Sequence, residues 1–385
     1  MTVQTMRNLD RFVGVPCCWI LAVVLRLLPP NKTGHSATEV HNILVVKFFG
    51  LGSIILSTAA LSMLKKRFPQ AMITFLSFES NRELLERIPL VDNVVTIGTS
   101  TLPTFASDLF SLVRKLSHAK YEVAFDFEFF SKFSTMIVGL SRARSRVGFA
   151  LPALWRSRLL THQVSLVKGL HVKEAFCSQV QALLGDASVE EIVPPNIFQQ
   201  DSASLDRKMP SREGSIITVN VNAGVTFIER RWAPYRFAEL IEELSREGNF
   251  FFVLTGTMPE RAYVQKVIET TSNPERCWNA AGLLSLPELG ALLQRSTLVI
   301  SNDSGPLHLA AALGAPTIGL FGPESPEFYG PIGSSAFSLY NKIPCSPCMN
   351  VYSAKSFRCP YNAQCMKSIQ VGDVKLMIEE VLAVA

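Results

Sequence analysis

Short apolar runs alternate with helical patterns along the first half of the chain. Residues 43–48, 72–77, 93–97 and 121–127 are apolar runs of strand length, and residues 54–67 have the length and apolar content of a helix. Strands that alternate with helices form βαβ units, in which the strands are parallel and helices cover the sheet. The pattern therefore predicts a doubly wound α/β domain.

The same alternation restarts near residue 215. The expected strands cover residues 216–221, 250–254, 298–301 and 317–321, and the expected helices cover residues 236–246, 286–295 and 306–313. Between the two halves, residues 194–214 contain several Pro, Ser and Asp residues, which predicts a linker. A chain of 385 residues also exceeds the size at which single cores stop growing, about 250–300 residues. We therefore expect two domains, residues 40–193 and 215–370, followed by a C-terminal helix over 371–385.

The N-terminal 39 residues have a different pattern. Residues 12–25 are apolar throughout, with arginines on both sides. This run is shorter than the ~20 residues that a membrane-spanning helix needs, and Pro16 interrupts it. No small-residue cleavage site of a signal peptide follows. We expect residues 1–39 to be a membrane-interface segment and linker, and the protein to be cytoplasmic, peripheral on the inner face of the cytoplasmic membrane.

Composition and charge exclude several classes of protein. Hydrophobic residues make up 48% of the chain and charged residues 18%, which excludes a disordered or fibrous protein. The 37 Lys and Arg against 32 Asp and Glu give a net charge of +5 without a polybasic run, so no nucleic-acid partner is expected. A mild positive charge suits a small anionic ligand or an anionic membrane surface instead.

Four of the eight cysteines gather near the C-terminus: Cys345, Cys348, Cys359 and Cys365. The others are adjacent or isolated, a distribution that suggests a reducing compartment. Four thiolates can bind zinc, and Cys-x-x-Cys is a usual half of such a site, but the second pair is spaced unusually for a zinc ribbon. The pattern leaves structural thiols and a metal site equally open, with a redox role behind both.

The segment with the most chemical information is residues 301–316, SNDSGPLHLAAALGAP. A strand ends at its beginning, and Asp303 and Ser304 occupy N-cap positions ahead of Pro306, a residue favoured in the first helical turn. The start of a helix presents unpaired backbone N–H groups and a partial positive charge. This segment therefore predicts a binding site for a diphosphate.

Two further residues support that interpretation. Gly305 lets a phosphate approach the backbone closely. His308 lies one turn into the helix, where its ring can donate to a phosphate oxygen. A well-capped core helix would account for Ser304 and Pro306, but not for a histidine in an otherwise apolar helix.

Two other segments follow predicted strands and are weaker signals. Residues 222–232, NAGVTFIERRW, pass through a glycine-containing loop to Arg230 and Arg231, and guanidinium groups pair bidentately with phosphate. Two arginines ahead of a helix are more often solvated charges. Residues 47–53, KFFGLGS, form a glycine turn but lack the third glycine of a dinucleotide fingerprint.

Together, residues 301–323, the Arg-Arg-Trp loop and residues 47–60 resemble the heptosyltransferase-like family, glycosyltransferase family 9, as does the C-terminal cysteine pattern. The resemblance runs from about residue 40 to the end and is most specific at 303–308. It implies a GT-B fold, with two Rossmann-like domains facing a central cleft, the acceptor on the first and the nucleotide-sugar on the second. It also implies an inverting, metal-independent transfer from ADP-heptose or a related donor to the lipopolysaccharide core, without a cofactor.

The resemblance also assigns roles to individual residues. Donor-binding roles fall on Asn222, Arg230, Glu260, Leu284, Asp303, Ser304, Gly305 and His308. Arg230 stands where the family usually has lysine, so its phosphate role is kept with a different geometry. Glu260 matches an acidic ribose contact, and Leu284 belongs to the segment that passes the base.

One departure from the family concerns catalysis. The family usually carries an aspartate after the glycine turn, as the base that deprotonates the acceptor hydroxyl, whereas this chain has Ser53. A serine hydroxyl cannot accept a proton near neutral pH, so the base is expected elsewhere. Asp126 is the first candidate and Glu128 the second, because both follow a strand of the acceptor domain where the sheet is expected to open. Ordinary solvation of a strand end explains them equally well.

These observations predict a glycosyltransferase that joins a sugar from a nucleotide-sugar to a lipopolysaccharide core or a lipid-linked glycan. A transferase of the same fold could use a different nucleotide-sugar in O-antigen or capsule synthesis. A relative that binds a nucleotide-sugar without turnover is a further alternative. Ser53 favours this last alternative. The intact donor segment, residues 301–316, opposes it.

Overall fold

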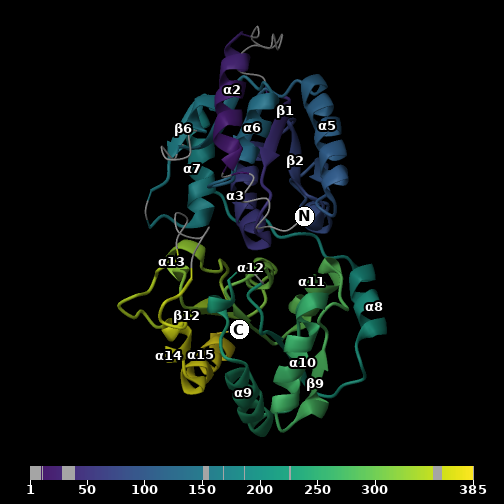
Figure 1. Cartoon of the computed structure of the whole chain (residues 1–385). Coiled ribbons are helices and arrows are strands. Elements are labelled where there is room, and N and C mark those ends of the chain that lie inside the picture. Colours follow the sequence, from purple (N-terminus) through teal and green to yellow (C-terminus); the bar gives the residue numbers. More distant parts are fainter. Residues whose placement is uncertain are drawn as a thin grey trace. The chain divides into compact units, whose positions relative to one another are not determined.

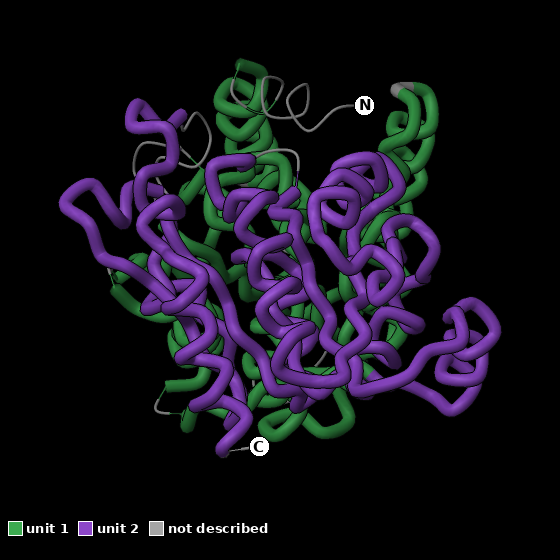
Figure 2. Tube along the Cα trace, turned by 90° about the horizontal axis from the view of Figure 1, so that it is seen from below, with its two compact units in different colours: residues 1–195 green, residues 196–385 purple. Residues whose placement is uncertain are grey.

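The computed structural model describes residues 10, 12–27, 40–150, 156–167, 169–185, 187–224, 227–349 and 358–384. The chain divides into two compact units, Met1–Pro195 (unit 1) and Asn196–Ala385 (unit 2), shown in different colours in Figure 2. Each unit contains a six-stranded sheet covered by helices (Figure 1). The prediction of two doubly wound α/β folds in series is confirmed.

Unit 1 has an all-parallel sheet in the order β3-β2-β1-β4-β5-β6. Its elements are α2 (Gly14–Leu27), β1 (Asn42–Val46), α3 (Leu51–Arg67), β2 (Met72–Phe78), η1 (Glu79–Asn81), α4 (Arg82–Leu85), β3 (Asn93–Ile97), α5 (Leu102–His118), β4 (Val123–Asp126), α6 (Lys132–Leu140), β5 (Ser145–Ala150), η3 (Ser157–Leu159), β6 (His162–Ser165) and α7 (Val172–Leu184). The strand order reverses between β1 and β4. Ligands of such sheets bind at this point, beyond the carboxyl ends of the strands.

Unit 2 repeats this topology in the order β12-β11-β10-β7-β8-β9, again all parallel. Its elements are α8 (Gln199–Lys208), β7 (Ser215–Asn220), η4 (Ile228–Arg230), α9 (Pro234–Glu247), β8 (Phe250–Leu254), η5 (Met258–Glu260), α10 (Arg261–Thr270), η6 (Pro274–Arg276), β9 (Cys277–Asn279), α11 (Leu286–Arg295), β10 (Leu298–Asn302), α12 (Gly305–Ala312), β11 (Thr317–Phe321), α13 (Pro326–Tyr329), β12 (Ala336–Tyr340), α14 (Gln364–Ser368) and α15 (Val371–Val384). The equivalent reversal lies between β7 and β10.

Residues 194–214, expected to be a linker, contain the helix α8. The Ser204 hydroxyl and the Lys208 ammonium group donate to the two carboxylate oxygens of Glu288 on α11, at 2.7 and 2.6 Å. These contacts attach α8 to unit 2. The polar composition that indicated a linker is therefore that of a surface helix.

The N-terminal apolar run forms α2, which docks on α6 of unit 1. Pro16 does not interrupt the helix, because it lies in the first turn, where its missing N–H is not needed. Cys18 is buried in a small apolar cluster with Leu159. The Asp10 carboxylate accepts from the backbone N–H groups of residues 132 and 133 at 2.7 and 2.8 Å, and so caps the start of α6. The linker expected before β1 lies largely in residues 28–39, outside the described part of the chain.

No helix among the described residues is long and apolar enough to cross a membrane.

Trp232 anchors the loop after β7 in the core of unit 2. Its side chain is fully buried, with its ring 4.9 Å from the ring of Phe237 in an edge-on arrangement. The indole Nε1 donates to the carbonyl of Ile369 at 3.0 Å. The backbone N–H of Trp232 donates to the Asn302 side chain at 2.9 Å, so this residue ties the loop to the end of β10.

We expect Trp232→Ala to lower the free energy of unfolding of unit 2 by about 3–5 kcal/mol, because it leaves a cavity and removes a buried hydrogen bond. Urea denaturation followed by circular dichroism measures this change. Tyr235→Ala is the control, because Tyr235 is 57% exposed, and it should change the free energy by less than about 1 kcal/mol. Equal losses in the two variants would contradict the anchoring role.

Candidate active site

A polar cluster lies at the strand-order reversal of unit 2, where α12 begins. Ser304 is the N-cap residue of α12, but its side chain makes no capping hydrogen bond. Its hydroxyl instead accepts from Asn220 Nδ2 at 2.7 Å and lies 3.1 Å from the Ser301 hydroxyl. The cap bond expected from the sequence is therefore absent. The first N–H groups of α12 lack this acceptor and are available to an anion.

Arg230 and Asp303 form an ion pair beside this helix start, with Arg230 Nη1 3.1 Å from Asp303 Oδ2. The Arg230 guanidinium also lies over the ring of Phe227, 4.9 Å from its centroid. Burial raises the pKa of Asp303 and the charge of Arg230 opposes that rise. The structure thus brings together two residues that the sequence placed far apart.

Glu324, which the sequence analysis did not single out, lies close to this pair. It follows β11 and is 3% exposed. Burial raises the pKa of Glu324 to about 8, with the nearby Asp303 carboxylate adding to the rise and Arg230 opposing it. Its carboxyl is therefore mostly protonated at pH 7. The only sequence signal was an acidic residue shortly after an apolar strand.

The C-terminal cysteine segment packs behind Glu324. The backbone N–H groups of Cys348 and Met349 donate to the carbonyl of Pro323 at 3.0 and 2.7 Å. The sulfur of Cys365 lies close to Gly322. No disulfide is formed by the described cysteines, and no group of three or more His, Cys, Asp or Glu among the described residues is arranged to hold a metal ion. The described part of this segment therefore supports the loop after β11, while Cys365 also belongs to the core of unit 2.

Two buried oxygens lie at the ends of β7 and β8 without a hydrogen-bond partner among the described residues: Asn222 Oδ1 and Thr255 Oγ1. The Asn222 amide donates to the Thr255 carbonyl at 3.0 Å. A Cβ at Gly256 would lie 2.6 Å from the Asn222 amide nitrogen, so glycine is needed there. Because buried polar atoms are normally paired, these oxygens mark a place for a polar ligand.

Glu260 uses one carboxylate oxygen for local structure. Oε2 accepts from the backbone N–H and the hydroxyl of Thr257, at 2.9 and 2.8 Å. Oε1 lies 3.5 Å from the Arg231 guanidinium and has no hydrogen bond among the described residues. Oε1 is therefore the carboxylate oxygen of Glu260 that a ligand could use.

The remaining donor-binding candidates come from α12 and from the segment before α11. Gly305 is the first residue of α12, and His308, one turn later, is 5% exposed. Leu284 is half-buried against a core cluster that includes Leu292. The neighbouring Gly282 has φ 74°, and a Cβ there would lie 2.7 Å from the Met258 backbone, so glycine allows these two loops to cross.

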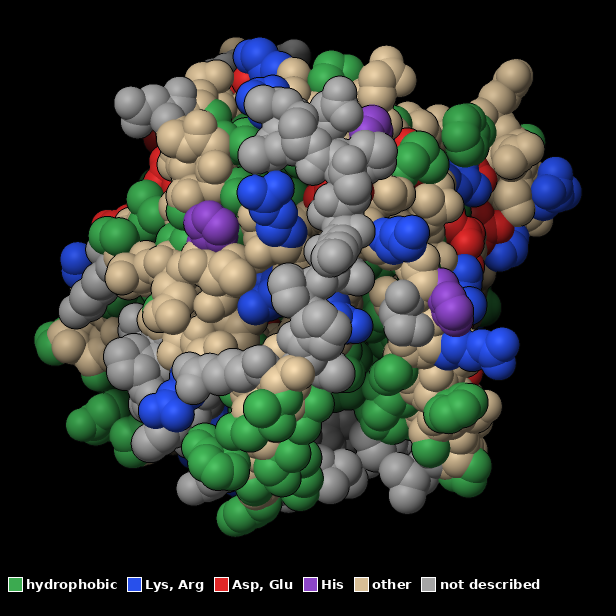
Figure 3. Space-filling model, turned by 90° about the horizontal axis from the view of Figure 1, so that it is seen from above, with side chains coloured by type: hydrophobic (Ala, Val, Ile, Leu, Met, Phe, Trp, Pro, Cys, Tyr) green, Lys and Arg blue, Asp and Glu red, His purple; other side chains and the backbone are tan. Residues whose placement is uncertain are grey.

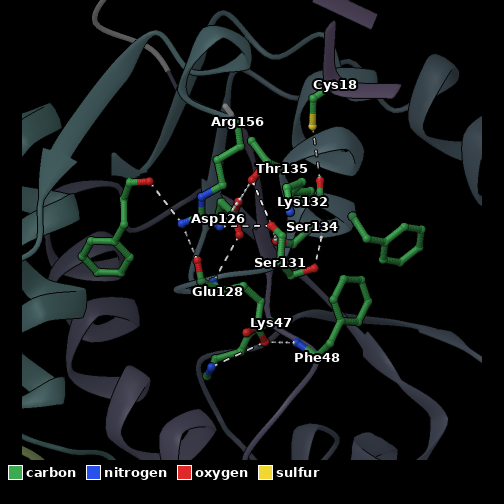
Figure 4. Close-up of polar contacts among 12 residues, drawn as sticks. Cys18, Lys47, Phe48, Asp126, Glu128, Ser131, Lys132, Ser134, Thr135 and Arg156 are labelled. Atoms are coloured by element: carbon green, nitrogen blue, oxygen red, sulfur yellow. Dashed lines mark hydrogen bonds and ion pairs between the residues drawn. The ribbon is translucent and has the colours of Figure 1, made fainter. Parts of the chain in front are cut away.

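In unit 1, Asp126 belongs to a buried network at the end of β4 (Figure 4). Asp126 and Arg156 are both 0% exposed, and Arg156 Nη1 lies 3.5 Å from Asp126 Oδ2. The Thr135 hydroxyl donates to the same carboxylate oxygen. Burial raises the pKa of Asp126, whereas Arg156 lowers it. The expectation that Asp126 lies at an open strand end is therefore wrong, because its carboxylate is the buried counter-charge of Arg156.

Glu128 lies next to this network and holds the turn after β1. Its Oε1 accepts from the backbone N–H groups of Phe48 and Phe49, at 2.7 and 2.9 Å, and lies 3.6 Å from the Lys47 ammonium group. The residue is 6% exposed. Glu128 therefore differs from Asp126, since a small part of it is still accessible. Its role as a base stays a prediction.

Ser53 lies in the first turn of α3, directly after the turn that Glu128 holds. Gly50 has φ 86° there, and a Cβ on it would lie 2.8 Å from the Ser53 hydroxyl. The first turn of α3 contains no acidic residue. Of the three catalytic candidates, Ser53 and Glu128 thus both adjoin the turn after β1, whereas Asp126 is buried inside unit 1.

Comparisons with known proteins agree on one family. The family model described as glycosyltransferase family 9 (heptosyltransferase) matches residues 109–356 of this chain. Lipopolysaccharide heptosyltransferase 2 of Escherichia coli K12 is 26% identical over 314 residues, which cover 76% of this chain and 86% of that protein.

Solved structures show the same fold. The glycosyl transferase family 9 structure from Veillonella parvula DSM 2008 has a TM-score of 0.75 at 22% identity, covering 92% of this chain and 100% of that chain. An Escherichia coli heptosyltransferase solved with ADP has a TM-score of 0.64 at 18% identity, covering 88% of this chain and 99% of that chain. The fold is therefore of the GT-B type. The family model matches more than half of the residues of this chain. The chain therefore belongs to glycosyltransferase family 9, the heptosyltransferase family, and is a glycosyltransferase.

Proposed function

We propose that the protein transfers heptose or a related sugar from an ADP-heptose-like donor to a lipopolysaccharide core or lipid-linked glycan acceptor, with inversion and without a metal ion. Relatives are lipopolysaccharide heptosyltransferases by name, and one solved neighbour holds ADP. The observation that carries the proposal is the cluster around the start of α12. Beside that helix start Arg230 pairs with Asp303, and the ends of the strands β7 and β8 carry the unpaired oxygens of Asn222 and Thr255.

The donor would bind to unit 2 with its diphosphate at the start of α12. Gly305 permits close approach of the phosphates, and Arg230 supplies a guanidinium. The helix dipole and this cation together neutralise the charge that develops on the leaving diphosphate, which supports a reaction without a metal ion. Ser304 and His308 would contribute further hydrogen bonds from the first turn.

The nucleoside would lie along the ends of β7 and β8. The open Oε1 of Glu260 and the oxygens of Asn222 and Thr255 are suited to accept from ribose hydroxyls. The segment that contains Leu284 would pass the base. These assignments follow from which polar atoms lack partners and from the family position of each residue.

The acceptor would bind to unit 1, where we assign the base to Glu128 rather than to Asp126. Glu128 would take the proton of the acceptor hydroxyl, whose oxygen bonds to the anomeric carbon as the bond from that carbon to the diphosphate breaks. The fully buried Asp126 cannot approach an acceptor. Ser53, which follows the same turn in the chain, would hydrogen-bond the acceptor and position it.

Such an acceptor is anchored in a membrane, so the protein would act at the inner face of the cytoplasmic membrane. The exposed apolar residues of α2 support this location. They would keep unit 1 next to its acceptor.

We expect Arg230→Ala to weaken ADP binding about 10- to 100-fold, because a hydrogen bond to a charged group contributes about 1.5–3 kcal/mol. Arg230→Lys keeps the charge and should retain most of the affinity. Isothermal titration calorimetry measures both. Arg246→Ala is the control, because the Arg246 side chain is 72% exposed on α9. If Arg230→Ala binds ADP as tightly as this control, Arg230 has no phosphate role.

The two carboxylates of unit 1 should respond differently to removal of their charge. Glu128→Gln keeps an oxygen for the turn but not the basicity, so turnover should fall about 10²- to 10⁴-fold with ADP affinity unchanged. Asp126→Asn leaves Arg156 uncompensated and should lower the free energy of unfolding by about 3–5 kcal/mol. Full activity in Glu128→Gln, assayed with the donor sugar, would remove the assignment of the base.

Glu324 predicts a dependence of stability on pH. Burial raises the pKa of Glu324 from its ordinary value of 4.5 to about 8, so the folded state holds this proton more tightly than the unfolded state. The resulting stabilisation is fully present below pH 4.5 and is lost as the pH rises through about 8, a change of at most about 5 kcal/mol. Urea denaturation at pH 5 and pH 8 should show this loss in the parent and much less of it in Glu324→Gln. The same pH dependence in both proteins would show that another group is responsible.

A further inference from the structure

The outward side of α2 exposes large apolar side chains, although its other side is docked on α6. The exposed residues include Trp19 at 55%, Ile20 at 56%, Val24 at 43% and Leu27 at 80%. α2 contains no acidic residue and a single arginine. Because monomeric proteins rarely expose large contiguous apolar patches, this surface indicates an interaction.

A groove runs between α2 and α5, with α6 as its floor. It encloses about 350 Å³, within the range of ~300–1,000 Å³ that is typical of sites for small molecules. Its lining includes Ile20 and Val24 of α2, Val113 of α5, and Phe133 and Met136 of α6. No polar atom of the described residues lines it. It therefore offers no hydrogen bond to a sugar, a nucleotide or a peptide backbone.

The chain around this groove is strongly basic. Residues 99–171, which include α5 and α6, contain ten Lys and Arg but four Asp and Glu. Asp126 and Glu128 are buried in unit 1, and Glu122 accepts from backbone N–H groups at the start of β1. Asp108 accepts from the N–H of residue 98 at 2.8 Å. The acidic side chains of this region are thus engaged. Lys132 and Arg156 are also buried and ion-paired, but other basic side chains, such as Lys115 and Arg144, are exposed.

Apolar and basic side chains occur together on one face of the molecule. Figure 3 shows two groups of hydrophobic side chains at the lower edge of the view, with a hollow between them, and Lys and Arg spread over the same face. Asp and Glu show mostly toward its margins. An apolar surface bordered by positive charge is complementary to an anionic bilayer.

We propose that the groove between α2 and α5 binds one acyl chain of an anionic membrane phospholipid, with the exposed face of α2 lying in the bilayer interface. A helix of another protein would also fill an apolar groove. The basic surroundings favour a lipid. Its anionic headgroup would lie near positive charge, while its acyl chain would contact only the apolar lining of the groove. The inference rests on the proposed function only in that the acceptor is membrane-anchored.

Two exposed lining residues allow a test that should not disturb folding. Val24→Asp and Val113→Asp place a charge at the mouth of the groove, where the parent side chains are 43% and 37% exposed. Leu376→Asp is the matched control, because Leu376 is 63% exposed on α15 of unit 2. Full-length parent and variants are titrated with cis-parinaric acid, a fluorescent fatty acid, and sedimented with vesicles of phosphatidylglycerol or phosphatidylcholine.

We expect the parent and Leu376→Asp to bind cis-parinaric acid and phosphatidylglycerol vesicles equally well, and both groove variants to bind each at least about tenfold more weakly. The parent should also bind phosphatidylcholine vesicles at least about tenfold more weakly than phosphatidylglycerol. Groove variants that bind the fatty acid like the parent would overturn the proposal, whatever the vesicles show. Equal binding to both lipids would overturn the choice of an anionic lipid.

Transfer to a deacylated, water-soluble acceptor separates this inference from the proposed function. Both groove variants should transfer sugar to it at the parent rate, because the groove contains none of the proposed catalytic residues. A parent that binds lipid through the groove but transfers no sugar would leave the inference standing and remove the function. Loss of transfer to the soluble acceptor in the groove variants, with their fold intact, would show that the groove serves the reaction and not the membrane.

Discussion

The ion pair between Arg230 and Asp303 fixes a cation at the start of α12, and the donor site that we propose for unit 2 is arranged around it. Trp232 makes this possible, because its buried side chain and its hydrogen bond to Asn302 hold the loop after β7 against the end of β10. Arg230, two residues earlier in the chain, is thereby placed opposite Asp303. Attraction between the two charges is strengthened where water is excluded. An incoming diphosphate would add a second anion beside Arg230, and the protonated carboxyl of Glu324 avoids a third negative charge there.

Both units contain an arginine–aspartate pair where the strand order reverses, but the two pairs differ in exposure. In unit 1, Arg156 and Asp126 are both fully buried. Arg156 also donates to the carbonyls of Glu128 and Phe149 at 2.8 and 3.1 Å, so it binds segments of its own domain together. In unit 2, the Arg230 side chain is 19% exposed. One topology thus carries a structural pair in the first unit and a pair that can meet a ligand in the second.

The sequence predicted strands well where an apolar run is continuous and missed them where the run is short or interrupted by polar residues. β8, β11 and α11 have the predicted bounds, because each is a continuous apolar run or a well-capped amphipathic helix. β5, β6, β9 and β12 were not anticipated. The last three are half-exposed edge strands without such a run, whereas the edge strand β3 has one and was predicted with its observed bounds. β5 lies in the interior of its sheet but begins with the polar Ser145 and Arg146. The donor segment was recognisable because its glycine, proline and histidine are adjacent in sequence. The alternation of side chains along β4 predicts the face of the sheet on which Asp126 lies, but not how deeply it is buried. Glu324 joins the site only because β11 pairs with β10 in the sheet, which the sequence alone does not show.

The central claim is that unit 2 holds the diphosphate of one particular nucleotide at the start of α12. A thermal-denaturation screen of the full chain against ADP, UDP, GDP and CMP tests it most directly. A ligand at 100 times its Kd should stabilise the folded state by about 2.7 kcal/mol. The account predicts that ADP alone raises the midpoint of unfolding and that Arg230→Ala greatly reduces the effect. No shift with any nucleotide, or a shift with ADP that Arg230→Ala leaves unchanged, would contradict it.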